Sequence, residues 1–140
     1  MIVTNISKKA GFYAYISNSG SSSVTVIDTT KQIVVPRIRV GGNPGALALT
    51  PHKAFLYVGN GNTASHSVSI IETKRHTVVA EVDVGLCPSS LAASTDGSTV
   101  RLEGRPRKEC SSLLQPLTAT RVPQIEGQHE IRVARSDNVW

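Results

Sequence analysis

Residues 15–55 read YISNSGSSSVTVIDTTKQIVVPRIRVGGNPGALALTPHKAF, and residues 57–99 read YVGNGNTASHSVSIIETKRHTVVAEVDVGLCPSSLAASTDGST. The second stretch repeats the first at an offset of 42 residues at its start (57 − 15) and 44 residues further on (68 − 24). The two extra residues fall between Asn60 and Ser67, in a Gly, Asn, Thr and Ser loop that tolerates insertion. A period of this length indicates a repeated supersecondary unit.

Two kinds of residue recur between the copies: the β-branched or aliphatic residues typical of strands, and the Gly and Pro residues typical of turns. The aligned pairs are Val24 with Val68, Ile27 with Ile71, Val34 and Val35 with Val78 and Val79, Val40 with Val84, Gly41 with Gly85, Pro44 with Pro88, and Leu47 and Ala48 with Leu91 and Ala92. Because strand and turn positions recur together, chance compositional bias does not account for the match.

Each unit contains four short runs of sheet-forming residues separated by turn signals. Four consecutive antiparallel strands in a repeat of this length are typical of a β-propeller blade. The sequence therefore predicts an all-β fold, a partial β-propeller of four-stranded antiparallel blades with an irregular C-terminal tail. In the first full set, the expected strands are residues 45–50, 55–59, 67–71 and 77–84.

The repeats divide the chain into two parts. Residues 1–104 are expected to hold about two blades plus the start of a third. Residues 105–140 lack the repeat and are interrupted by prolines, so we expect a disordered or loosely attached tail, with one short strand at 131–134. The other expected strands are 2–7, 13–17, 24–27 and 33–40 in the earlier blade, and 90–94 and 99–102 in the third.

The abrupt change of text after Gly104 suggests that the tail arises from a shifted reading frame or an inaccurate gene boundary. Reading the source DNA in its other frames tests this hypothesis, because an absence of further propeller motifs downstream would dispose of it. A natural short variant is the alternative.

The chain resembles the YVTN family of β-propeller repeat proteins over residues 1–104. The residues that carry the resemblance are Tyr15-Ile16-Ser17-Asn18, 24–29, 34–44 and 46–51 in one copy, and Tyr57-Val58-Gly59-Asn60, 68–73, 78–88 and 94–97 in the next. The third copy departs from the pattern, with Arg101-Leu102-Glu103-Gly104 in place of the Tyr-Val-Thr-Asn motif. The resemblance implies a ring of about seven blades, of which this chain supplies only part.

Composition narrows the partners. The formal net charge is +5, but the basic residues are scattered through the repeats and only Arg105, Arg107 and Lys108 form a short run. Scattered charge is typical of solvated loops and sheet edges, so a nucleic-acid partner is disfavoured. Residues 1–10 lack the apolar stretch of a signal peptide, no run is long enough to span a membrane, and the compartment stays open.

No residue pattern predicts chemistry, so we assign no catalytic, cofactor-binding or metal-binding residue and expect no cofactor. Asp28 and Glu72 fall at the same place in both copies, but acids followed by Thr29 and Thr73 are typical of turn caps. Cys87 and Cys110 have no metal-ligand spacing, and a disulfide between them is an open alternative. The four histidines, His52, His66, His76 and His129, stand singly.

Function is therefore ranked on architecture. The leading hypothesis is a non-enzymatic binding or scaffold module, similar to propeller repeats of microbial cell-surface and envelope proteins, that binds a protein partner or self-associates through uncovered blade faces. The alternatives are a fragment of an enzyme-type propeller, lactonase-like or like a nitrite-reductase haem domain, and a nucleic-acid-binding propeller. Loops near the central channel are the favoured ligand positions, which makes Asn43 and Cys87 weak candidates.

Overall fold

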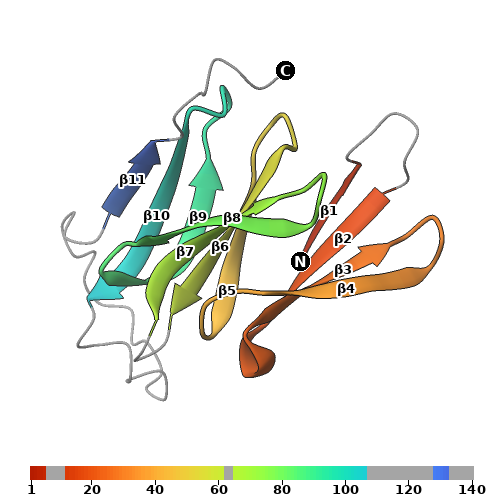
Figure 1. Cartoon of the computed structure of the whole chain (residues 1–140). Helices are drawn as coiled ribbons and strands as arrows, with labels where there is room; N and C mark the ends of the chain where they lie inside the picture. Colours follow the sequence, from red (N-terminus) through yellow and green to blue (C-terminus); the bar gives the residue numbers. More distant parts are fainter. Residues whose placement is uncertain (6–11, 62–64, 107–127, 133–140) are drawn as a thin grey trace, which may run out of the picture.

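The computed structural model describes residues 1–5, 12–61, 65–106 and 128–132. These residues form three antiparallel sheets that lie side by side (Figure 1). The first sheet, blade 1, has the order β1-β2-β3-β4, and the second, blade 2, has the order β5-β6-β7-β8. The third sheet, blade 3, contains β9, β10 and β11. The chain is therefore all-β and forms a partial β-propeller with four-stranded antiparallel blades, as the repeat predicts.

The strands follow the alternation of apolar residues and turns closely. Blade 1 contains β1 (Ile2–Asn5), β2 (Phe12–Asn18), β3 (Ser23–Asp28) and β4 (Ile33–Arg39). Blade 2 contains β5 (Pro44–Leu49), β6 (Phe55–Gly61), β7 (His66–Glu72) and β8 (Thr77–Asp83). Pro36 lies inside β4 without disrupting the sheet, because β4 is an edge strand and its pairing with β3 is irregular at that point.

Blade 3 extends further than the repeat indicates. β9 spans Leu86–Ala93 and β10 spans Thr99–Pro106, so the strand continues through residues 101–104, where the Tyr-Val-Thr-Asn motif is missing. β11, Gln128–Arg132, pairs with β10 and overlaps the strand expected at 131–134. The expected boundary between 104 and 105 thus falls inside β10, and the remaining tail residues lie outside the described part of the chain.

Each blade presents two faces, and β6 shows how one strand serves both. We call the face of blade 2 that lies against blade 1 the leading face, and the face against blade 3 the trailing face. Successive side chains of a strand point to opposite sides. Leu56 and Val58 therefore join the core between blades 1 and 2, while Tyr57 joins the core between blades 2 and 3.

The two inter-blade cores use the same positions, one repeat apart. The first core contains Tyr15, Val24, Val26 and Ile38 from blade 1, and Leu56, Val58 and Ile71 from blade 2. The second contains Ala48, Tyr57 and Val68 from blade 2, and Val100 and Leu102 from blade 3. The repeat in the sequence is thus a repeat of an inter-blade contact.

The hairpin turns match their sequence signals. Asp96 and Gly97 form the β9–β10 turn, with Gly97 at a φ of +69° that favours glycine. Hydrogen bonds from the Ser94 hydroxyl and from the backbone and hydroxyl of Ser98 lower the pKa of Asp96 to about 2. The turn therefore keeps its carboxylate charged at all ordinary pH values.

Candidate functional site

A groove lies where the three blades meet, on the side where β5 and β9 begin. Its cavity has a volume of about 580 Å³, within the usual range for small-molecule sites. Blade 1 contributes two serines, blade 2 contributes the start of β5 and the end of β6, and blade 3 contributes the start of β9 and the end of β10. The lining residues are Ser17, Ser19, Asn43, Pro44, Gly45, Ala46, Gly61, Cys87, Pro88, Ser89 and Arg105.

The sequence placed its two ligand candidates correctly near each other. Asn43 and Cys87 both line the groove, each just before or within the first strand of its blade. First strands of neighbouring blades contact one another, β1 with β5 and β5 with β9, which is the arrangement of inner strands around a propeller axis. The prediction that channel-side loops hold the candidate site therefore agrees with the geometry.

Most polar groups of the groove are already held by the backbone. The Ser17 hydroxyl donates to the carbonyl of Gly45 (2.9 Å), and the Ser89 hydroxyl donates to the carbonyl of Glu103 (3.2 Å). The side-chain amide of Asn43 donates to the carbonyl of Gly61 (2.7 Å). These bonds fix the orientation of the serine and asparagine side chains before any ligand arrives.

Cys87 has no free thiol. It is buried and disulfide-bonded, and its sulfur lies 3.5 Å from Nδ1 of the buried His66. The chain's other cysteine, Cys110, lies outside the described residues. Cys87 therefore contributes shape to the groove and not a nucleophile.

The two inter-blade connections that lead into the groove need their matched glycines for different reasons. A Cβ on Gly41 would lie 2.6 Å from the side-chain nitrogen of Asn60, so Gly41 permits a close approach. A Cβ on Gly85 would meet nothing within 4 Å, but Gly85 has a φ of +66°, which favours glycine.

The asparagine that ends the second strand of each full blade ties that strand to the third. The Asn60 amide donates to the hydroxyls of Ser67 (3.1 Å) and Ser69 (2.8 Å). In blade 1, the Asn18 amide reaches the hydroxyl of Thr25 at 2.8 Å. Sequence reasoning noted these asparagines as part of a resemblance only, although their recurrence beside hydroxyl residues was the available signal.

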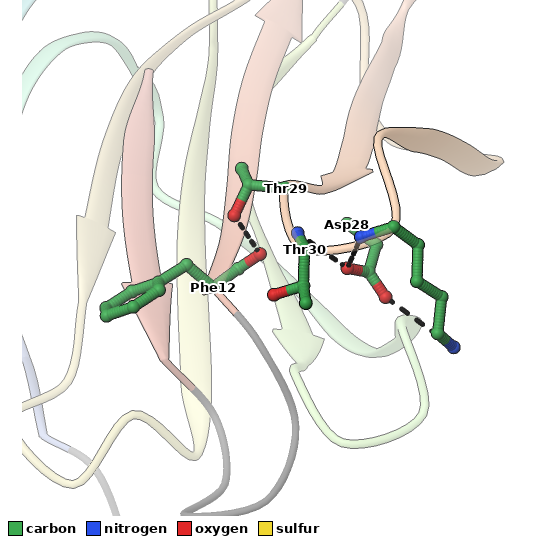
Figure 2. Close-up of polar contacts among 5 residues, drawn as sticks. Phe12, Asp28, Thr29 and Thr30 are labelled. Atoms are coloured by element: carbon green, nitrogen blue, oxygen red, sulfur yellow. Dashed lines mark hydrogen bonds and ion pairs between the residues drawn. The ribbon is translucent and has the colours of Figure 1, made fainter.

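The recurring acids cap turns, as expected for Asp28. One oxygen of Asp28 accepts hydrogen bonds from the backbone N–H groups of Thr30 and Lys31, both at 3.0 Å, and the Lys31 ammonium lies 3.7 Å from the other oxygen (Figure 2). The Thr29 hydroxyl donates to the carbonyl of Phe12 (Figure 2). Glu72 makes a different contact, an ion pair with Arg75 at 3.6 Å.

His76 is the histidine with a defined structural partner across blades. Its Nδ1 lies 3.2 Å from the Tyr15 hydroxyl, and its ring lies 5.0 Å from that of Tyr13. Burial lowers the pKa of His76, and burial together with the nearby Tyr13 raises the pKa of Tyr15. The tyrosine hydroxyl therefore stays protonated and can donate to a neutral imidazole.

No group of three or more His, Cys, Asp or Glu side chains that could hold a metal ion occurs within the described ranges. His52 lies exposed in the β5–β6 turn, and His129 belongs to β11. None of the helices described is long and apolar enough to cross a membrane.

The leading face of blade 1 is the second candidate surface. Phe12, Ala14 and Ile16 alternate along β2, and Ile27 pairs with Ala14 and with Val34 across the sheet. These positions match Leu56, Val58, Ile71 and Val78 of blade 2. Val34 is 63% exposed, whereas Val78 is 38% exposed, because a neighbouring blade lies against blade 2 but not against this face of blade 1 in the described part.

No protein-family model matches the chain, and no curated protein sequence matches it significantly. Solved structures do resemble it. It is similar to hydrazine synthase of Kuenenia stuttgartiensis, with 38% identity and a TM-score of 0.61, over 66% of this chain and 26% of that chain. It is also similar to the dihydro-heme d1 dehydrogenase NirN in complex with DHE, with 25% identity and a TM-score of 0.58, over 65% of this chain and 19% of that chain.

The Dos1 propeller shares the fold at 16% identity, with a TM-score of 0.61 over 73% of this chain and 28% of that chain. The chain thus spans about a quarter of the hydrazine synthase chain, 26%, and a smaller share of NirN, 19%. Together with the three sheets and their repeated cores, these likenesses identify the chain as part of a β-propeller.

Proposed function

We propose that the chain is a non-enzymatic binding and scaffold module of the YVTN type, and that the leading face of blade 1 is its binding surface. The observation that carries the proposal is the match between this face and the leading face of blade 2. Leu56, Val58 and Ile71 are fully buried under blade 1, while Ile16 and Ile27 of blade 1 are half-buried. The same row of side chains that binds a sheet in one blade is open in the other.

The assignment to the YVTN type rests on what its signature residues do. The tyrosines of the motif, Tyr15 and Tyr57, fill the inter-blade cores, and the asparagines, Asn18 and Asn60, tie the second strand to the third. These roles recur at one position per blade. They explain why a blade of this kind keeps a tyrosine and an asparagine three residues apart.

The proposed partner is a second copy of this chain, docked face to face. Head-to-tail docking is disfavoured because the other end of the array is charged. Arg101 takes the place of Tyr57 on the trailing face of blade 3, with Glu103 beside it, and both are exposed. The apolar leading face of blade 1 has no apolar counterpart there, but it is complementary to itself, as a two-fold interface requires.

The test is the oligomeric state of the full chain across concentrations, measured by size-exclusion chromatography with light scattering. We expect a monomer that becomes a dimer, and no larger species, as concentration rises. The variant Ile16→Lys should stay monomeric, while Arg101→Ser, at the opposite end, should dimerise normally. A compact and cooperatively folded monomer at all concentrations contradicts the proposal, and open-ended growth contradicts the face-to-face geometry.

The division of the chain into residues 1–104 and a separate tail at 105–140 is kept as part of the proposal. Because β11 pairs with β10, limited proteolysis tests the division directly. We expect cleavage between β10 and β11 and none within β5 to β8. Uniform protection of the whole chain would contradict a separate tail.

A fragment of an enzyme-type propeller is the second candidate, favoured by the 38% identity to hydrazine synthase. Metal and haem analysis of the purified full chain tests it. Stoichiometric metal or haem would support this candidate, and the dimerisation experiment would be read independently of it.

A further inference from the structure

We propose that the groove between the three blades is a binding site for a small hydroxylated carboxylate of the sugar-acid class. The groove lies within one chain and does not include the leading face of blade 1. This proposal goes beyond the scaffold function and can fail while that function stands.

The charge of the lining is the first argument. Arg105 is the only charged side chain in the lining, and it comes from the end of β10. Its guanidinium forms no ion pair or side-chain hydrogen bond in the described structure, and it is partly buried. A guanidinium can form two parallel hydrogen bonds with one carboxylate, so the groove offers a directional anion site.

The hydrogen-bonding capacity of the neutral residues is the second argument. Ser17 and Ser89 each give their hydroxyl proton to a backbone carbonyl, so toward the groove their oxygens act as acceptors. The amide of Asn43 is held by Gly61, which leaves its carbonyl oxygen as a further acceptor. Acceptors of this kind need a ligand that carries donors, and hydroxyl groups are the simplest donors.

The apolar part of the lining is the third argument. Pro44, Ala46 and Pro88 lie beside the polar groups and offer a surface for the C–H face of a ring. A sugar acid combines the required features, because it carries a carboxylate for Arg105, hydroxyl donors for the serines, and a C–H face. A neutral sugar lacks the first feature, and a simple carboxylate such as acetate lacks the others.

The test is calorimetric titration of the full chain with glucuronate, with glucose and acetate as comparison ligands. We expect saturable binding of glucuronate, and weaker binding of the other two. The variant Arg105→Gln should weaken glucuronate binding at least about tenfold, because a charge-assisted pair is lost. Arg101→Gln is the matched control, an exposed arginine on the same strand outside the groove, and it should leave the affinity unchanged.

Nuclear magnetic resonance gives a second measurement that does not depend on any variant. Titration with glucuronate should shift the backbone amides of Gly45, Gly61 and Ser89, which belong to the groove, and leave blade 1 outside the groove unaffected. The proposal is overturned by an absence of glucuronate binding, by equal affinity for glucose, by an unchanged affinity in Arg105→Gln, or by shifts elsewhere.

Discussion

Blades 1 and 2 carry the same row of side chains on corresponding faces, but the row is sealed in blade 2 and half open in blade 1. Ile27 pairs with Ala14 in blade 1 as Ile71 pairs with Leu56 in blade 2. Ile71 is fully buried and Ile27 is not. The difference teaches that the repeat specifies two apolar faces in every blade, and that burial of each face depends on the neighbour.

The matched isoleucines give the largest expected effect. Ile71→Ala should lower the free energy of unfolding by about 3 kcal/mol, because it leaves a cavity in a sealed inter-blade core. Ile27→Ala should cost only about 1 kcal/mol in the monomer, because less apolar area is removed from a half-open face. Urea unfolding at a concentration that keeps the chain monomeric measures both. Equal losses would show that the leading face of blade 1 is also covered.

The asparagine clamps should show the same asymmetry on a smaller scale. Asn60→Ala removes two hydrogen bonds from a fully buried site, so we expect a loss of about 2 kcal/mol. Asn18 is half-buried, and water can replace its partners, so Asn18→Ala should cost about 1 kcal/mol. Thermal unfolding of the two variants compares them. A larger loss for Asn18→Ala would contradict the ranking of the two blades.

The matched glycines test whether the two inter-blade connections are under different constraints. Gly41→Asn should cost about 1.5 kcal/mol, because its Cβ displaces the Asn60 amide from its bonds. Gly85→Asn should be nearly neutral, because asparagine tolerates positive φ and the space is open. The chemical midpoint of unfolding provides the measurement. The reverse order would mean that conformation outweighs contact at both positions.

The fold was predictable from the sequence because strand and turn residues recur at fixed offsets, and this pattern is local. Phase along the chain even assigned the inner strands, which placed Asn43 and Cys87 at one site. Arg105 was not predictable, because it follows the last recognisable repeat and enters the groove only through the continued pairing of β10 with β9. The uncovered face was expected as a class of surface, but its charged opposite end depends on three-dimensional register.

The smallest expected effect concerns the contact between Tyr15 and His76, which belongs to the covered interface alone. Burial lowers the pKa of His76 from 6.5, so the neutral ring is favoured in the folded chain. Its stabilising contribution is fully present above pH 6.5, the ordinary value, and is lost as the pH falls below it.

His76→Gln removes this titration and places in the turn the residue type that blade 1 has there, since Gln32 and His76 both adopt positive φ, 55° and 53°. We expect the variant to lose about 1 kcal/mol at pH 7.5, the value of one hydrogen bond, and to lose less stability than the native chain on acidification to about pH 5. Stability measured by urea unfolding across this range provides the check. Because Asp96 titrates near pH 2, its turn does not contribute to the change. A native chain whose stability is constant over the range would mean that the protonated ring keeps its place against Tyr15, and that the interface between blades 1 and 2 is held by its apolar core alone.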